Sequence, residues 1–238
     1  MADKSPHSGH RERVRERILS QGFDGFQPHE ILEFLLFHTI PRKDTNIIAH
    51  ELINTFGSLQ GVLDASAEEL MEKGKLSETS AVLLSSITDI FAYYEKNRKI
   101  TQPIKTPEKM KQLFKPYFIS ENCEKLVAAY FDSALKVKEI NVVSTGRESG
   151  LTFNTKAIIR TAITSEAHFV AIAHNHPATS AVPSKSDINA TNDLKNQLEQ
   201  FDIRLTDHII FSTNETFSFA NNEQLNCFVS GGTKQWQK

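Results

Sequence analysis

Two histidines and a carboxylate stand at a spacing that suits a single metal ion. His174-x-His176 is followed, after seven further residues, by Ser184-x-x-Asp187. Imidazole nitrogens and carboxylate oxygens are common zinc ligands, and three of them leave a fourth position open for water. The spacing therefore predicts the kind of metal site that a catalytic zinc ion requires.

The flanking residues indicate how these side chains are positioned. Residues 167–173 (AHFVAIA) are typical of a short apolar strand that leads into the first histidine. Side chains two apart on a strand share a face, so His174 and His176 should leave its end together. The loop 177–183 has the length to bring the following helix back over that strand end.

The same residues also have a purely structural interpretation. Two histidines at a strand end can be partly exposed polar groups. Ser184-x-x-Asp187 behind a proline is a helix-capping motif, in which the serine oxygen accepts an unpaired backbone N–H and the carboxylate favours the helix N-terminus. Capping and metal binding are compatible, because a ligand in the first turn of a helix is rigidly held.

The length and composition of the whole chain are typical of a globular protein. It has 238 residues, a formal net charge of −2 and 39% hydrophobic residues, which argues against a strongly basic nucleic-acid coat protein. We find no apolar run near the ~20 residues needed to cross a membrane, nor a secretory signal core. Cys123 and Cys227 do not suggest a disulfide framework, so we expect a cytoplasmic location, with Cys123 as a small buried residue.

The pattern of apolar residues divides the chain. Residues 1–98 predict a small all-helical domain, 99–107 a linker with two prolines, and 231–238 a tail. Residues 108–230 contain segments with strand patterns alternating with helical ones, which predicts an α/β (α+β) domain with a central sheet. The expected strands are 126–131, 138–145, 168–174 and 203–212.

Several residues predict where helices begin and end. Pro28 suits a first helical turn, Asp44 can cap the helix 45–56, and Ser66 with Glu69 forms a capping box. Asn154 can cap a helix that starts at Thr155.

The metal motif resembles that of the JAB/MPN/JAMM metalloproteases. The version His-Asn-His-Pro is similar to the bacterial RadC proteins, which carry the historical label of DNA repair proteins. The resemblance covers most of the chain, and the C-terminal motif is its most specific part. Further similar segments are Thr206-Asp207-His208-Ile209-Ile210, Phe217-Ser218-Phe219, GHRERVRERIL at 9–19 and HEILEFLLF at 29–37.

This resemblance implies a JAB/MPN-like fold and a role for each motif residue. His174, His176 and Asp187 would bind Zn²⁺, and Ser184 would donate a hydrogen bond to the oxyanion formed as a carbonyl is attacked. The zinc ion would lower the pKa of its water to about 7. Two histidines and a carboxylate also suit Fe or Mn, so the choice of Zn²⁺ comes from the family.

A glutamate should transfer the proton from the water to the leaving nitrogen. The family pattern places this glutamate far upstream, at the start of the first core strand, where Glu124 stands. Glu121 is the alternative, and Glu139 and Glu148 fit less well because neither opens a core strand. Glu124 could instead be a solvated charge at a strand entrance.

Two neighbouring polar residues follow the metal motif. Asp207 and His208 are adjacent on an expected strand, so their side chains should point to opposite faces. We expect one of the two to support a metal ligand by a hydrogen bond, or to be a buried polar group. The sequence does not decide which.

The helical half bears on DNA binding. RadC-like proteins carry a helix-hairpin-helix element with a Gly-x-Gly turn, but here Leu76 replaces the second glycine after Gly74, so the element is degenerate. Arg13 and Arg17 share a helix face and are a weak nucleic-acid candidate, since interleaved glutamates could make that face a solvated one. A second departure is Phe153-Asn154-Thr155-Lys156, where the family shows His-Pro-Arg-Glu.

These observations predict a zinc-dependent metallohydrolase that cleaves a peptide or isopeptide bond, with an unknown protein or peptide substrate and no membrane association. The alternative is a DNA-associated or protein-binding module in which the metal is structural or vestigial. Salt-dependent binding to DNA would favour this alternative.

Overall fold

The computed structural model describes residues 9–119, 123–146, 153–177, 179–213 and 215–222. The chain forms two compact units, Met1–Phe91 and Ala92–Lys238, and each is described by itself. Between Lys96 and Pro107 the backbone has no helix or strand. This stretch includes residues 99–106 of the predicted linker, whose last residue, Pro107, begins the next helix. None of the described helices is long and apolar enough to cross a membrane.

The first unit is helical. Its elements are α1 (His10–Gln21), α2 (Pro28–Leu36), α3 (Thr45–Phe56), α4 (Leu59–Asp64), α5 (Ala67–Glu72) and the start of α6 (Glu78–Lys96). The predicted caps are confirmed: Asp44 accepts the backbone N–H of Asn46, and Ser66 and Glu69 form a reciprocal capping box. Helix α4 was not predicted from the sequence; Ser58 caps it by accepting the N–H of Gly61.

The core of the first unit is formed by aliphatic side chains from α2 to α6. Fully buried members include Leu32, Leu52, Leu70 and Leu84. Gly74 is fixed by this packing, because a Cβ there would lie 2.6 Å from the Leu70 carbonyl oxygen. This unit therefore buries a hydrophobic cluster of its own.

The second unit is the expected α/β domain, which confirms the predicted fold class. Five strands lie in the order β2-β1-β3-β4-β5, with β3 and β4 parallel and the other neighbours antiparallel. Its elements are α7 (Pro107–Phe114), a 3-10 turn (Lys115–Tyr117), β1 (Lys125–Phe131), β2 (Val137–Thr145), α8 (Thr155–Thr164), β3 (Phe169–Asn175), α9 (Lys185–Glu199), β4 (Arg204–Phe211) and β5 (Thr216–Ser218).

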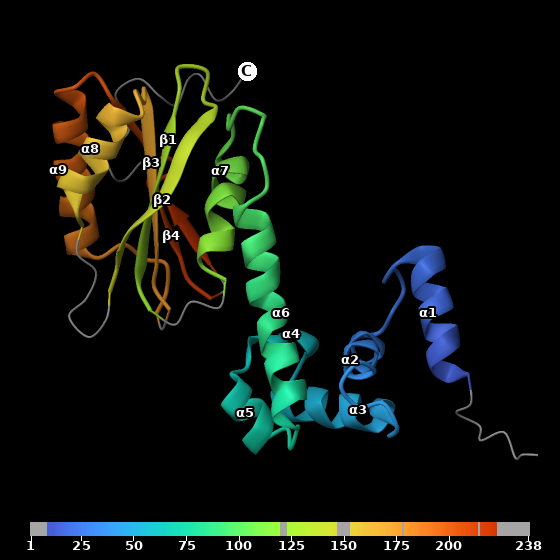
Figure 1. Cartoon of the computed structure of the whole chain (residues 1–238). Helices are drawn as coiled ribbons and strands as arrows, with labels where there is room; N and C mark the ends of the chain where they lie inside the picture. The colour runs from blue at the N-terminus through green and yellow to red at the C-terminus, as the bar shows by residue number, and fades with distance from the viewer. Residues whose placement is uncertain (1–8, 120–122, 147–152, 178, 214, 223–238) are drawn as a thin grey trace, which may run out of the picture. The chain divides into compact units, whose positions relative to one another are not determined.

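Helices cover both faces of this sheet (Figure 1). On one face α8 and α9 bury Ile158 and Leu194 against the even-numbered side chains of β1 and β3, such as Leu126. On the other face α7 packs Met110 against the odd-numbered side chains, such as Val127. Because both faces are covered, side chains of both parities are buried, and such strands appear in the sequence as continuous apolar runs. His174, an even-numbered residue of β3, lies on the face covered by α8 and α9.

Candidate metal centre

Strand β3 delivers the two histidines. It is hydrogen-bonded to β1 and β4, so its end is rigidly held. His174 lies in the strand and is 1% exposed, whereas His176 follows it and stays attached to the sheet by its N–H to the Phe211 carbonyl, 2.7 Å. The Nε2 atoms of His174 and His176 lie 2.9 Å apart, as expected for residues that share a strand face.

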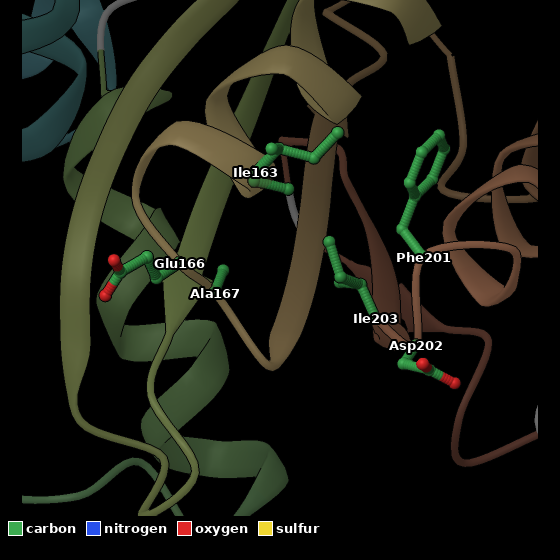
Figure 2. A pocket seen from close by; sticks show the side chains of 7 residues that line it. Ile163, Glu166, Ala167, Phe201, Asp202 and Ile203 are labelled. Carbon is green, nitrogen blue, oxygen red and sulfur yellow. The ribbon is translucent and has the colours of Figure 1, made fainter.

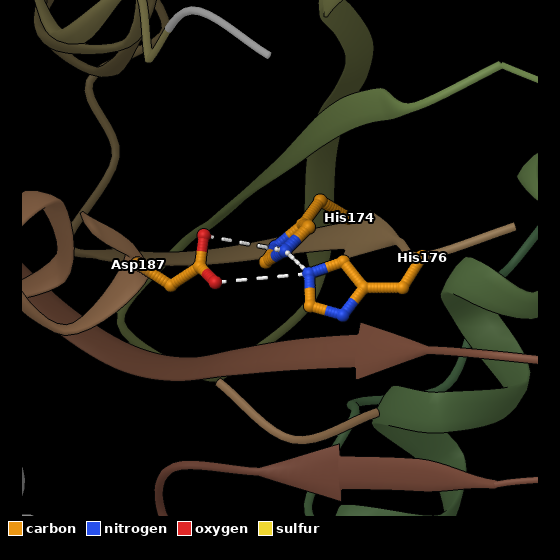
Figure 3. Close-up of side chains that lie close together, drawn as sticks. All are labelled: His174, His176 and Asp187. Carbon is orange, nitrogen blue, oxygen red and sulfur yellow. Dashed lines mark hydrogen bonds and ion pairs between the residues drawn. The ribbon is translucent and has the colours of Figure 1, made fainter. Parts of the chain in front are cut away.

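Helix α9 delivers the carboxylate (Figure 3). The Asp187 oxygens lie 3.5 Å from His174 Nε2 and 3.7 Å from His176 Nε2. One ligand atom from each of these three residues lies within 4.8 Å of the other two, a grouping that could hold a metal ion. The structure thus brings together the three residues that the sequence predicts as ligands.

Ser184 is the N-cap of α9, in a capping box with Asp187. Its Oγ accepts the backbone N–H of Asp187 at 3.1 Å and donates to Asp187 Oδ2 at 2.6 Å. The backbone N–H of Ser184 donates to the same carboxylate oxygen at 2.8 Å. The capping interpretation is therefore confirmed, and the carboxylate is fixed by its own helix start.

Burial controls the charge of the first histidine. Desolvation lowers the pKa of His174 to about 4, with the Asp187 carboxylate acting in the opposite direction and His176 adding to the decrease. At neutral pH the imidazole is therefore uncharged, which is the form that binds a metal.

Of the adjacent pair on β4, His208 lies at the site. Its Nε2 is 2.7 Å from Nδ1 of His174, and its ring stacks on Phe219 with centroids 4.6 Å apart. Asp207 points to the other face, where it accepts hydrogen bonds from Ser218 Oγ and the Ala220 N–H. The alternation rule separated the two side chains, and the structure assigns the supporting role to His208.

Phe153 lies against both of these histidines. Its ring meets those of His174 and His208 edge-on, with centroids 6.0 and 5.7 Å apart. Asn154 then caps α8 by accepting the Ala157 N–H, as predicted. The segment that departs from the family pattern thus contributes an apolar wall to the histidine cluster.

Glu124 directly precedes β1 and is half-buried. Leu126, two residues on, pairs with His174 and packs on the α8/α9 face. Strand alternation would carry the Glu124 side chain to that face as well. Glu139 pairs with Tyr130, farther along β1 from the site, and Glu121 and Glu148 lie outside the described residues.

Asn175, which the sequence did not single out, holds the segment around Glu124. Its Oδ1 accepts the Lys125 N–H at 2.7 Å and its Nδ2 donates to the Cys123 carbonyl at 3.0 Å. The side chain continues the β1–β3 pairing after the ladder ends at Leu126. Cys123 itself is exposed, so the expectation of a buried cysteine is wrong, because it precedes the strand and only its backbone is engaged.

Some of the residues that are candidates for nucleic-acid binding make contacts within the first unit instead. Arg17 donates to Glu30 at 2.7 Å and lies 3.9 Å over the Phe26 ring, whereas Arg13 is exposed. In the degenerate hairpin the Leu76 N–H donates to the Leu70 carbonyl at 3.2 Å. The backbone N–H of Leu76 is therefore already hydrogen-bonded within the helical unit, whereas phosphate binding would need it as a donor.

A shallow pocket lies elsewhere on the second unit (Figure 2). Its lining includes the apolar side chains of Ile163, Phe201 and Ile203 and the carboxylates of Glu166 and Asp202. Ala167, another lining residue, comes just before β3 begins, whereas His174 is near the strand's other end. The pocket therefore belongs to the opposite end of the sheet from the candidate metal centre.

A helix-flanked sheet with His-x-His at a strand end and a carboxylate in the next helix is the arrangement of a JAB-like domain. Residues 104–225 match the family model described as the RadC-like JAB domain. The chain belongs to the RadC family.

Similar proteins cover nearly the whole chain. A UPF0758 protein of Fusobacterium nucleatum is 37% identical over 227 residues, which span 92% of this chain and 97% of that protein. A UPF0758 protein of a Psychrobacter species is 31% identical, with 92% and 97% covered. A third, from Carboxydothermus hydrogenoformans, is 30% identical with the same coverage. The likeness thus includes the helical unit.

Proposed function

We propose that this protein is a zinc-dependent hydrolase of peptide or isopeptide bonds. The carrying observation is the convergence of His176 Nε2, His174 Nε2 and the Asp187 carboxylate on one point. Nδ1 of His176 lies 2.9 Å from the Ser180 carbonyl oxygen, which can only accept, so this nitrogen carries the ring proton. Nε2 of His176 therefore presents a lone pair to the cluster.

The donor set fits zinc. Two neutral imidazoles and one carboxylate match catalytic zinc sites, which keep a position open for water. His176 is partly exposed whereas His174 is buried, so solvent reaches one side of the cluster. Fe or Mn would accept the same ligands, and family membership favours zinc.

Zinc held there would supply Lewis-acid activation of water and of the scissile carbonyl. Glu124 would accept the proton of the attacking water and pass it to the leaving nitrogen. The Ser184 hydroxyl would donate to the developing oxyanion. In the structure that hydroxyl donates to Asp187, so the oxyanion role requires an exchange of partner.

The DNA-associated alternative has less support from the described residues. Arg17 has a carboxylate partner, and the Leu76 amide is bonded internally. Arg13 is the exposed cation of the pair. Loss of salt-dependent DNA binding in Arg13→Ala would favour this second function over hydrolysis alone.

Metal content of the purified protein, measured by mass spectrometry, tests the proposal. We expect about one zinc per chain, lost in His176→Ala and in Asp187→Ala while circular dichroism shows a retained fold. His168→Ala is the matched control, since His168 is exposed before the other end of β3. A folded wild type that takes up no metal when zinc is supplied contradicts the proposal.

The proton-transfer role needs a separate variant. Glu124→Gln should keep zinc and lose turnover in a screen of peptide and isopeptide substrates, because the amide cannot accept the proton. Full turnover in this variant removes Glu124 from the mechanism and leaves the metal site intact.

A further inference from the structure

Behind His174 lies a buried chain of hydrogen bonds that leads back to the ligand helix. Nδ1 of His174 faces Nε2 of His208 at 2.7 Å, and Nδ1 of His208 faces Thr191 Oγ1 at 2.6 Å. Thr191 Oγ1 lies 2.5 Å from the backbone carbonyl oxygen of Asp187. Thr191 and His208 are both 0% exposed. We call these linked groups, from Thr191 through His208 to His174, the histidine relay.

The direction of every proton in the histidine relay follows from its last acceptor. The Asp187 carbonyl can only accept, so the single hydroxyl proton of Thr191 is donated to it. The Thr191 oxygen is then an acceptor for His208, and the proton of the neutral His208 ring must be on Nδ1. Its Nε2 is left with a lone pair.

That lone pair determines the first metal ligand. Nε2 of His208 can only accept, so in the histidine relay His174 donates to it through Nδ1 and keeps Nε2 unprotonated. The competing arrangement is a proton on His174 Nε2 that is donated to His176 Nε2 at 2.9 Å, and it would leave His174 Nδ1 without a proton for His208 to accept. We propose that Thr191 and His208 are positioning residues that fix the tautomer of His174, so that its Nε2 lone pair is available to a cation. The cation in this inference comes from the proposed function, whereas the proton positions come from the hydrogen bonds described above.

Asp187 contributes two different groups to this arrangement. Its carboxylate lies beside both histidine Nε2 atoms, and its backbone carbonyl orients His174 through the histidine relay. Partners that set the tautomer of a ligand histidine are usually a carboxylate, a carbonyl or water. Here the carbonyl acts through two intervening side chains.

The tautomers can be measured in the metal-free protein at neutral pH. Long-range ¹H–¹⁵N correlation spectra of ¹⁵N-labelled protein distinguish a ring proton on Nδ1 from one on Nε2. We expect His174 and His208 to carry the proton on Nδ1. A wild-type His174 protonated on Nε2 overturns the inference, and this measurement needs no variant that must fold.

Two variants of Thr191 then separate the hydroxyl from the packing. Thr191→Val keeps the volume and removes the acceptor, so His208 should shift its proton to Nε2 and His174 should become protonated on Nε2. Zinc affinity should then fall by about ten- to a hundredfold. Thr191→Ser keeps the hydroxyl and should restore the tautomer and the affinity of the wild type.

The two measurements distinguish this inference from the proposed function. Wild-type protein with the Nδ1 tautomers but without zinc binding refutes the zinc proposal and leaves the relay standing. Equal zinc affinity in wild type, Thr191→Val and Thr191→Ser refutes the relay and leaves the zinc proposal standing.

Discussion

Asp207 is a buried carboxyl group whose oxygens accept hydrogen bonds from Ser218 Oγ at 2.7 Å and the Ala220 N–H at 3.0 Å. Burial raises its pKa from 3.8 to about 6, against the hydrogen bonds, which lower it. The folded protein therefore keeps this proton to a higher pH than the unfolded chain. Its contribution to stability is present at low pH and decreases as pH rises from about 4 to 6.

Asp207→Asn should remove this dependence. The Ser218 hydroxyl can accept from the new amide, and no charge forms in the core at high pH. The variant should gain stability relative to wild type as pH rises, reaching about 1–3 kcal/mol above pH 6. Urea unfolding at pH 5 and pH 7.5 would check this, and an equal difference at both values would contradict it.

The unfolding free energies of wild type and Asp207→Asn must be compared with each other at each pH. Burial lowers the pKa of His174 and of His208, so the folded state resists their protonation. These two histidines destabilise the metal-free fold as pH falls below about 6.5, with the sign opposite to that of Asp207. The difference between variant and wild type isolates the carboxyl group.

Among the residues of the site, those linked by local rules could be predicted from the sequence. His174, His176 and Asp187 lie within one short segment, and their spacing was sufficient. Thr191 was missed, although it stands one helical turn after Asp187 on the same helix face. Asn175 could not have been found, because its partners lie 50 and 52 residues away, and only the register of β1 on β3 brings them together.

At the scale of elements, the capping box of α9 both starts a helix and fixes the carboxylate of Asp187, a proposed metal ligand. Ser184→Ala should lower the free energy of unfolding by about 1 kcal/mol and also weaken zinc binding, because the Asp187 carboxylate loses the hydroxyl that fixes it. Ser66→Ala removes the equivalent cap of α5 in the first unit. That control should reduce stability similarly and leave zinc affinity unchanged, which chemical denaturation and zinc titration would check.

The bridge from β3 to the start of β1 depends on an amide side chain. Asn175→Asp keeps an acceptor for the Lys125 N–H but faces the Cys123 carbonyl with a second acceptor. We expect a loss of about 1–3 kcal/mol in unfolding free energy. Asn196→Asp, the same change at an exposed position of α9, should have little effect, and equal losses in both variants would contradict the role of Asn175.

The elements themselves were largely predictable because they depend on local patterns. Strands β1 and β3 were apolar runs bounded by polar residues, and the caps of α3, α5 and α8 were present in the sequence. Helix α4 was missed because its six residues are too few for an apolar period to be distinguished from a loop. The sheet order, which puts β3 between β1 and β4, required the structure.

At the scale of the whole molecule, each unit contains its own hydrophobic clusters. The clusters that include Leu32 and Phe26 contain only residues of the first unit, and those around Leu126, Val127 and Ile210 only residues of the second. A fragment of residues 92–238 should therefore unfold in one cooperative transition and bind zinc as tightly as the full chain. Calorimetry and zinc titration would check this; an unfolded fragment would show that the second unit depends on the first.

Strand β3, helix α9 and parallel strand β4 form one continuous stretch, Phe169–Phe211. It contains His174, His176 and Asp187 together with the histidine relay, so short-range chain closure is enough to assemble the ligands. Glu124 joins only when β1, far earlier in the chain, pairs with β3. In the proposed function, metal binding would therefore need only this stretch of the chain, whereas the proposed proton transfer would also need β1 to be paired with β3.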